Sequence, residues 1–584
     1  MNDTLRYIVC AILIFIIIVL QPYYLEWLGY GSVELYETKK DDQITSNKDY
    51  HNEDYHINTD IKNVDNEFIK SNFKTNSKNK SFITVISPLY TTTISNQSGG
   101  SFTTFIINNN NNSRKYIGGY DQSGIYSPDI PVSLIMPQEE LCTPCLGAYD
   151  ERNDQYIYFT QFFEPVYSYS NDTIFINDDE QVELTYKLNN NNETIITKSI
   201  ILYGNSFKSN HSFAFNQENL NLPGSLELIW KDGLRPTEEK ADEDVLYGYG
   251  IINQAGEVED IQMKSIEKPL LRQSYLGQTN WAAIRTKYFI TSIIAKEHGS
   301  YATLASKNTS FGTRDFTPVY STSIGFSHNL SYIESIIYLG PLEVDLINSA
   351  ESSLDATMNL GWGFIRPISK GILWFLKFIH NTININYGFV ILIFACLIRV
   401  ITGPLTKMSF KSNQNMQKVQ PELKKIQAKY KGNPQALNKE TMALYKKHKI
   451  NPAGGCLPIL IQMPILYSLF IVFRTTIEFR GAPFLFWIQD LSKPDVVFSL
   501  PFSIPIYGDG VAILPLIMGI TLLLTTQISS ASMDSSQKPI MYFMNGFFIL
   551  LFNTFPSGLN LYYTAYNLLN FFQQRNIRSQ LNAK

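Results

Sequence analysis

The feature that most constrains this chain is the segment at residues 387–407, which reads YGFVILIFACLIRVITGPLTK. It is apolar enough to enter a bilayer, yet it carries Arg399 in its second half. An arginine keeps its proton at any relevant pH, and placing it at bilayer depth costs at least about 2.5–3.5 kcal/mol. Arg399 therefore either extends to the headgroups near Lys407 or lines a water-filled groove within the membrane. The rest of the sequence favours the groove.

The composition divides the chain in two. The region up to about residue 350 is polar and rich in Asn, Ser, Thr and Tyr, whereas the remainder alternates apolar stretches with a basic loop. A length of 584 residues leaves room for two or three domains. The net charge of −4 gives no excess of positive charge of the kind that indicates a nucleic-acid partner. The sequence therefore predicts an α+β membrane protein.

The first 80 residues predict a membrane anchor followed by a flexible tether. Residues 7–20 are almost wholly apolar, Arg6 precedes them, and no A-x-A-like cleavage site follows. We therefore expect residues 1–28 to form an uncleaved signal anchor with a cytosolic N-terminus. Residues 29–80 are charged and rich in Asn, with few hydrophobic side chains, which is typical of a mobile segment.

Residues 81–350 show a period of two and predict a large antiparallel β-sandwich outside the cytosol. Val182, Leu184, Tyr186 and Leu188 alternate with polar residues, and the Asn-rich stretch 189–192 then predicts the turn of a hairpin. No His, Asp or Glu cluster there has catalytic or metal spacing, although carbohydrate processing stays open as an alternative. Cys142 and Cys145 are expected to form a local disulfide or to be a pair of unlinked thiols.

The remainder predicts an interfacial helix and a membrane core. Residues 358–381 mix aromatic residues with Arg366, Lys370 and Lys377, which suits an amphipathic helix in the membrane interface. The core, residues 384–584, contains five expected spans, at about 387–406, 457–475, 511–527, 540–555 and 558–574. With the anchor these make six spans and place both termini in the cytosol. Several spans are shorter than a full bilayer requires, which indicates local thinning or a polar vestibule. The spans also carry side-chain amides and hydroxyls, namely Gln462, Thr521, Thr525, Gln527, Asn553 and Asn567.

The loop at residues 408–450 is the strongest topological signal. Together with Lys407, it holds eleven Lys against two acidic residues, Glu422 and Glu440, and so belongs on the cytosolic side. Heptad spacing from Met416 to Tyr430 and a break at residues 432–434 predict a helical hairpin. The hairpin is either a solvated, topogenic surface or a docking surface, whose candidate residues are Lys418, Lys424, Lys425, Lys429, Lys446 and Lys447.

Several motifs resemble the membrane insertases of the YidC/Oxa/Alb family. They are NPAGGCLPILIQMPIL at residues 451–466, RVITGPLTK at 399–407, APFLFWIQDLS at 482–492 and FPSGLNLYY at 555–563. The anchor, the β domain and YLGPLE at 338–343 resemble the six-span bacterial form, whose β domain is a periplasmic supersandwich. The resemblance implies an inner-membrane insertase and chaperone that acts without ATP, metal or cofactor and is not an enzyme.

The resemblance also implies a site. In the family, five core helices enclose a groove that is open to the cytosol and to lipid. Its arginine matches Arg399, a substrate-contacting position matches Tyr563, and Gln462 and Met463 stand in the IQMP motif. We add Met518 as an apolar contact, and Phe484, Phe486 and Trp487 as a candidate cap on the periplasmic side. The implied partners are nascent membrane proteins, the bilayer and the Sec translocon, with the ribosome or the signal-recognition machinery as candidates.

Two departures and one rival accompany the resemblance. Ala395 stands where some relatives have a hydroxyl, and the tail after Phe572 has only three cationic residues, so no strong tail-mediated ribosome contact is expected. The rival function is a small-solute transporter or channel with Arg399 as an anion site. Transporters usually contain repeated halves, and the sequence has no such internal repeat.

Overall fold

The computed structural model describes residues 79–582, apart from residues 109–113, 139, 151–154, 168, 170–171, 191–192, 217–224, 264–269, 313, 328–329, 351–352, 449–456 and 531–537. The predicted anchor, residues 1–28, and the predicted tether up to residue 78 lie outside the described residues. The described chain forms two compact units, one ending at Met358 and the other beginning at Asn359.

The first unit, called the β unit here, contains a small sheet and a large sheet. The small sheet has the order β3–β2–β1–β9, in which only the β1–β9 pair is parallel. Its strands are β1 (Phe82–Ile86), β2 (Tyr90–Ser95), β3 (Ser101–Ile107) and β9 (Thr173–Phe175). A separate two-stranded ribbon pairs β4 (Ile117–Tyr120) with β5 (Tyr126–Pro131).

The large sheet has 13 strands in the order β7–β6–β13–β18–β17–β19–β12–β11–β10–β8, with β16, β14 and β15 branching from β17. Its strands are β6 (Cys145–Asp150), β7 (Gln155–Tyr158), β8 (Glu164–Pro165), β10 (Gln181–Asn190), β11 (Glu193–Tyr203), β12 (Lys208–Phe215), β13 (Leu226–Trp230), β14 (Tyr249–Gln254), β15 (Glu257–Ile261), β16 (Leu270–Arg285), β17 (Phe289–Phe311), β18 (Arg314–Gly325) and β19 (Tyr332–Pro341). Two short helices, α3 (Ala241–Tyr247) and α4 (Val344–Asn348), complete the unit.

The predicted hairpin is confirmed as the β10–β11 pair. Its strands are antiparallel, and Val182 lies opposite Leu202. Val182, Leu184, Tyr186 and Leu188 are all buried, while the residues between them are exposed or half-buried. Successive side chains of a strand point to opposite faces, so this alternation places one face of the hairpin in the core.

The two sheets pack face to face, as a sandwich predicts. Phe102 of β3 contacts Trp230 of β13 and His211 of β12, with ring centroids 6.3 and 6.0 Å apart. Cys142 and Cys145 are joined by a disulfide, which is one of the two states expected from the sequence. The described residues therefore confirm a mixed α+β protein with a large β-rich domain.

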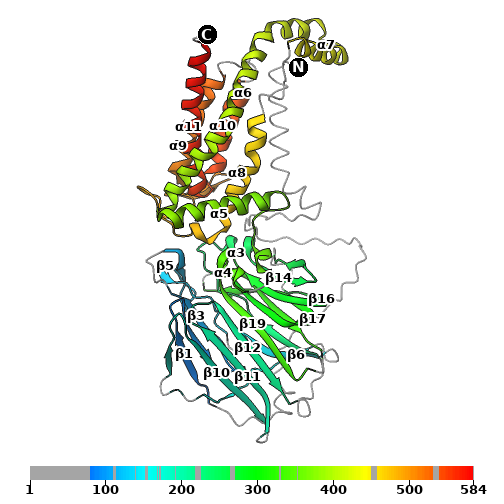
Figure 1. Ribbon diagram of the computed structural model, residues 1–584, viewed down its shortest axis with the longest axis vertical. Coiled ribbons are helices and arrows are strands. Elements are labelled where there is room, and N and C mark those ends of the chain that lie inside the picture. Colours follow the sequence, from blue (N-terminus) through cyan, green and yellow to red (C-terminus); the bar gives the residue numbers. More distant parts are fainter. Residues whose placement is uncertain are drawn as a thin grey trace. The chain divides into compact units, whose positions relative to one another are not determined.

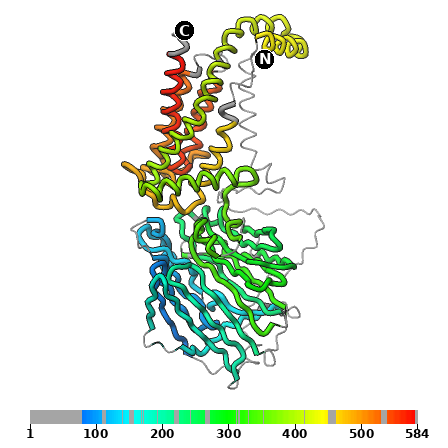
Figure 2. The backbone as a smooth tube through the Cα atoms, in the orientation of Figure 1, coloured from blue at the N-terminus to red at the C-terminus, as the bar shows by residue number. Residues whose placement is uncertain are grey.

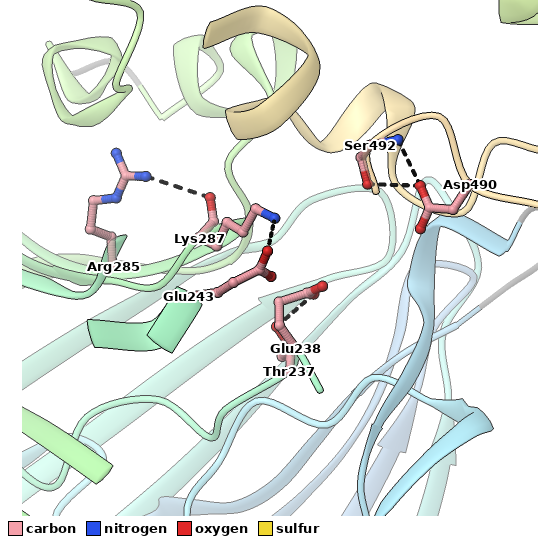
Figure 3. A network of polar contacts seen from close by, with 7 residues as sticks. All are labelled: Thr237, Glu238, Glu243, Arg285, Lys287, Asp490 and Ser492. Atoms are coloured by element: carbon pink, nitrogen blue, oxygen red, sulfur yellow. Dashed lines mark hydrogen bonds and ion pairs between the residues drawn. The ribbon is translucent and has the colours of Figure 1, made fainter. Parts of the chain in front are cut away.

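Arg285 and Lys287, at the end of β16 and just after it, make polar contacts inside the β unit (Figure 3). Lys287 forms an ion pair of 3.0 Å with Glu243 of α3. The guanidinium of Arg285 is buried and donates to the backbone carbonyls of Thr286 and Thr357. Thr357 immediately precedes Met358, the last residue of the unit, so Arg285 holds the exit of the chain against β16.

The second unit, called the helical unit here, contains seven α-helices and one β-hairpin in the described chain. They are α5 (Ile365–Ile383), α6 (Tyr387–Lys429), α7 (Pro434–Lys447), α8 (Leu457–Thr475), β20 (Val496–Ile504), β21 (Gly508–Ala512), α9 (Ile513–Ser530), α10 (Lys538–Phe552) and α11 (Ser557–Asn582). Helix α11 packs against α6 and α9, and α10 packs against α9. Figure 1 shows α5 lying crosswise to α6 and α8–α11.

Helix α6 differs from the expected pattern because it does not stop after the first core span. It runs for 43 residues through Pro404 and Pro421, so the expected span and the first arm of the basic hairpin are one helix (Figure 2). Its N-terminus is capped by Asn386, whose side chain accepts from the backbone N–H of Gly388. Asn433 caps α7 in the same way, and Pro434 occupies its first turn.

The hydrophobic residues at heptad spacing on α6 pack against α7. Val419 and Leu444 form a buried cluster on which Met416, Leu423 and Ile426 lie. We call this end of the unit the α7 end and the opposite end the α5 end. At the α5 end, Lys377 of α5 forms an ion pair of 3.3 Å with the buried Glu478.

One helix of the described chain, α6, is long and apolar enough to cross a membrane. Shorter apolar helices occupy Ile461–Thr475, Ile513–Ile528 and Lys538–Phe552. These three lie where the sequence predicts short spans.

Candidate functional site

Arg399 lies inside the helical unit, about 18 Å along α6 from its first residue at 1.5 Å per residue. Its side chain is only 6% exposed. Nη1 donates to the hydroxyls of Thr406, at 3.2 Å, and Tyr566 of α11, at 3.4 Å. The guanidinium also lies over the Tyr566 ring, 5.5 Å from its centroid. Arg399 thus extends along α6 as far as Thr406, the residue before Lys407, and is buried there against Tyr566 of α11.

The guanidinium of Arg399 is incompletely satisfied. Nε and Nη2 are buried, and within the described chain neither has a hydrogen-bond partner. Buried charged groups are normally paired or hydrogen-bonded, because an unpaired one is strongly destabilising. No carboxylate stands among the contacts of Arg399 given above. The site is therefore suited to a polar or negatively charged group supplied from outside the chain.

Polar side chains continue from Arg399 toward the α7 end. Thr525 of α9 donates to the backbone carbonyl of Asn567 at 3.2 Å, and Asn545 of α10 donates to Thr526 at 2.9 Å. The buried polar residues of this half of the bundle are Thr402, Thr406, Ser409, Thr521, Thr525, Thr526, Asn545, Asn567 and Gln574. Such side chains bond helices to each other in lipid, and Thr406 among them also accepts from Arg399.

Aromatic side chains fill the bundle on the other side of Arg399, toward the α5 end. Phe394, one turn before Arg399, lies 5.9 Å from Tyr562. Phe473 and Tyr387 lie 4.8 and 5.0 Å from Phe479. All of these distances join ring centroids within the range for favourable aromatic pairs. Ring contacts therefore join α6 to α11, and α6 and α8 to Phe479, on this side of Arg399, where Ser468 and Asn560 are buried as well.

The three residues of the candidate cap divide into Phe484, which packs on α6, and the stacked pair of Phe486 and Trp487. Phe484 packs on the start of α6, with its ring centroid 5.1 Å from that of Phe389. Trp487 donates to Asp495 at 2.8 Å, and Phe486 is 91% exposed. In the same loop, the Asp490 carboxylate accepts from the backbone N–H and the hydroxyl of Ser492 (Figure 3). Among the three, only Phe484 has a recorded ring contact with α6.

The other predicted groove residues lie on different helices and do not all meet Arg399. Gln462 of α8 lies beside the hydroxyl of Tyr563. Met463 is exposed on α8, whereas Met518 is buried in α9. Tyr563 contacts Phe552 of α10, with ring centroids 5.5 Å apart. Gln462 and Tyr563 thus form one contact and Arg399 with Tyr566 another.

Three residues of the Arg399 site were missed by the sequence reasoning. Thr402 and Thr406 follow Arg399 by three and seven residues, a spacing that places them on the same helix face. Tyr566 follows Tyr563 by three residues and shares a 3.3 Å hydrogen bond with Thr402. The helical period could have identified both threonines. The choice of Tyr566 over Tyr563 depends on the rotation of α11, which the sequence does not reveal.

The six lysines proposed for docking are all exposed on α6 and α7. The α7 arm is held by the Val419–Leu444 cluster, so these charges stand on a packed hairpin.

Two family models match this chain. The model of the 60Kd inner membrane protein family matches residues 378–584, and the model of the YidC periplasmic domain matches residues 160–375. These two models cover the helical unit and most of the β unit.

Curated relatives of this chain are named as membrane protein insertases. "Membrane protein insertase YidC" of Chlorobium phaeovibrioides is 34% identical over 418 residues, which are 68% of this chain and 69% of that protein. The protein of the same name from Prosthecochloris aestuarii is 33% identical over 407 residues, with the same coverage. A solved structure of an active YidC insertase covers 86% of this chain and 95% of its own, at 17% identity and a TM-score of 0.33.

Proposed function

Because the chain belongs to the YidC family of membrane protein insertases, we propose that it inserts nascent membrane proteins into the bacterial inner membrane and assists their folding. The β unit is then periplasmic, the α7 end is cytosolic and the α5 end faces the periplasm. The Sec translocon is the proposed partner for clients that enter through a channel. The lysines of the α6–α7 hairpin are the proposed docking surface for the acidic machinery that delivers nascent chains.

The observation that carries the proposal is the buried, incompletely satisfied guanidinium of Arg399, whose two hydroxyl partners lie on α6 and α11. Moving the polar flank of a client across hydrocarbon is the main barrier to insertion. A polar half-groove reaching Arg399 from the cytosol would shorten that dry path. An acidic or polar flank would supply the hydrogen-bond acceptors that Nε and Nη2 lack.

The apolar part of the client would leave by another route. Met463, exposed on α8, presents a flexible surface against which a hydrophobic segment can pack before it enters lipid. Partition of that segment supplies the driving force, at roughly 25 cal/mol per Å² of apolar surface removed from water. The rings of Phe394 and Tyr562 close the groove on the periplasmic side, so that the membrane barrier is kept.

The test compares Arg399→Ala and Arg399→Lys in proteoliposomes, with insertion of a single-span client with an acidic flank measured by protease protection. We expect Arg399→Ala to reduce insertion strongly and Arg399→Lys to retain most of it, because a cation remains. Val400→Ala, at the adjacent and exposed position, is the matched control. Wild-type insertion by both Arg399 variants would contradict the role of the charge.

A further inference from the structure

The β20–β21 hairpin exposes a large apolar surface for which the function proposed above has no use. From Val496 to Ile506 it contains no charged residue. Phe498 and Phe502 are 62% and 60% exposed. The exposed large hydrophobic residues of the hairpin are Val496, Val497, Phe498, Phe502, Ile504 and Ile506. An exposed apolar ribbon of this kind is an aggregation site in water, so its natural environment must cover it.

The start of the hairpin is anchored by Asp495. Its carboxylate Oδ2 accepts from the indole N–H of Trp487 at 2.8 Å. The same oxygen accepts from the backbone N–H groups of Ile513 and Leu514, at 3.2 and 2.7 Å. Asp495 therefore caps the first turn of α9 while it holds the beginning of β20.

The return strand is anchored by Asn553, at the end of α10. Its Oδ1 accepts from the backbone N–H of Ala512 at 3.0 Å. Its Nδ2 donates to the carbonyls of Tyr507 and Gly510, at 2.7 and 2.6 Å. Because both ends are held, the apolar side chains are presented in a fixed place and do not belong to a loose loop.

We propose that this hairpin inserts its apolar side chains into the periplasmic leaflet of the bilayer, as a second membrane anchor of the helical unit beside α5. The inference goes beyond the proposed function because it does not depend on Arg399. Three observations point to lipid as the occupant. β21 ends at Ala512 and α9 begins at Ile513, so the ribbon is continuous with an apolar helix. Residues 496–506 carry no charge for a soluble partner to pair with.

The third observation is that another element of the α5 end has the same character. Helix α5 and the turn before it expose Trp362, Phe364, Trp374 and Phe378. Aromatic side chains are enriched at the membrane–water interface. Helix α5 and the hairpin together would hold the periplasmic end of the bundle at one depth in the leaflet.

The test measures the environment of an environment-sensitive dye attached to the full chain in lipid nanodiscs. Cys10, Cys396 and Cys456 are first replaced by Ser, and the Cys142–Cys145 disulfide is kept. Phe502→Cys and Ile506→Cys report on the hairpin, at two positions so that a folding defect in one leaves the other. Leu516→Cys, exposed on the apolar helix α9, is the lipid control. Leu276→Cys, 87% exposed on β16, is the water control.

We expect both hairpin dyes to resemble the Leu516 dye, with blue-shifted emission, strong quenching by nitroxide-labelled lipid and weak quenching by iodide. Emission and iodide quenching like those of the Leu276 dye would overturn the proposal. Shielding of both hairpin dyes from both quenchers would also overturn it, because a protein surface would then cover the hairpin.

Discussion

At the residue scale, Lys198 and Arg399 are both buried cations, but the chain satisfies their hydrogen-bond donors to different degrees. Lys198 is completely buried in the β unit, and its ammonium donates to the carbonyls of Ser98, Gly100 and Pro144 at 3.0–3.2 Å. All three of its hydrogens can therefore be satisfied by the chain. Arg399 has five N–H donors and only two recorded acceptors, both bound by Nη1. The donors of the first cation are filled within the β unit, whereas the second, within the described chain, keeps free the donors that the proposed function assigns to a client.

The hydroxyls beside Arg399 are predicted to matter for polar clients. Thr406→Val keeps the shape of the side chain but removes an acceptor of the guanidinium, and a hydrogen bond to a charged group contributes about 1.5–3 kcal/mol. We expect insertion of a client with an acidic flank to fall by at least about tenfold, the factor for 1.4 kcal/mol, because the guanidinium loses one of the two hydroxyls that hold it in position. A client with an uncharged flank should be inserted at the wild-type rate.

The control for this prediction is Thr564→Val on α11, whose hydroxyl donates to the carbonyl of Asn560. Both rates are measured by protease protection in proteoliposomes. Equal loss for both clients would indicate a general structural defect in place of a weakened charge site.

Lys198 predicts a pH dependence of the stability of the β unit. Burial lowers the pKa of Lys198 to about 7 from its ordinary value of 10.5. Between these values the unfolded chain binds a proton that the folded chain does not, so the free energy of unfolding rises with pH. The slope from Lys198 is at most about 1.4 kcal/mol per pH unit, and it vanishes below about pH 7, where both states are protonated. Burial also lowers the pKa of His211 well below 6.5, which adds a slope of the same sign in the acid range.

We expect Lys198→Met to remove the rise above about pH 7, as measured by urea unfolding of the detergent-solubilised chain with pulse proteolysis of the β unit. Lys187→Met, on the neighbouring strand β10 with a half-buried side chain, is the control and should keep the rise. An unchanged slope in the Lys198 variant would show that the lysine does not titrate in this range.

At the scale of elements, the sequence predicted the structure correctly where a periodic hydrophobic pattern lies on one buried face of a strand or helix. The alternation at residues 182–188 predicts a half-buried strand, and the heptad at residues 416–430 predicts packing against a second helix; both are present. Continuity of α6 was missed because the sequence changes from apolar to basic near Lys407, which ends a membrane span but need not end a helix. Pro404, near the same point, does not break the helix either. Proline is tolerated in membrane helices, where neighbouring groups satisfy the freed carbonyls.

Two other features could not be predicted because they depend on distant parts of the chain. No strand was predicted at β20–β21, because Pro501 within β20 and Pro505 in the turn weaken a strand signal. Its anchors, Asp495 and Asn553, come from either side of α9. Likewise, the face of α11 that meets Arg399 is selected by packing against α6 and α9 together.

The contact between α7 and α6 predicts a selective effect at the element scale. Leu444→Ala removes a buried side chain from the Val419 cluster, a change that typically costs about 2–5 kcal/mol in a core and less in a small cluster. We expect faster limited proteolysis of the α6–α7 hairpin, while Met442→Ala, at an exposed position two residues earlier, leaves the rate unchanged. Equal proteolysis of both variants would mean that the cluster does not hold α7.

At the scale of the whole molecule, the division into two units separates the candidate groove from the β unit. Each unit has its own buried core, and every residue proposed to contact a client lies after Asn359. Hydrophobic stabilisation comes from area buried within a core, so removal of one unit leaves the burial inside the other in place. The chain connects them through the segment around Thr357, which Arg285 binds from the β unit.

We therefore predict that a chain with residues 81–358 deleted, so that residue 80 joins Asn359, retains a folded helical unit and inserts a simple single-span client in proteoliposomes. Thermal unfolding in detergent reports on folding, and protease protection reports on insertion. Arg399→Ala in the shortened chain is the control and should abolish most of the remaining insertion, because the groove is the same. If the shortened chain folds but inserts nothing, the β unit takes part in the insertion step itself, and the groove is insufficient without it.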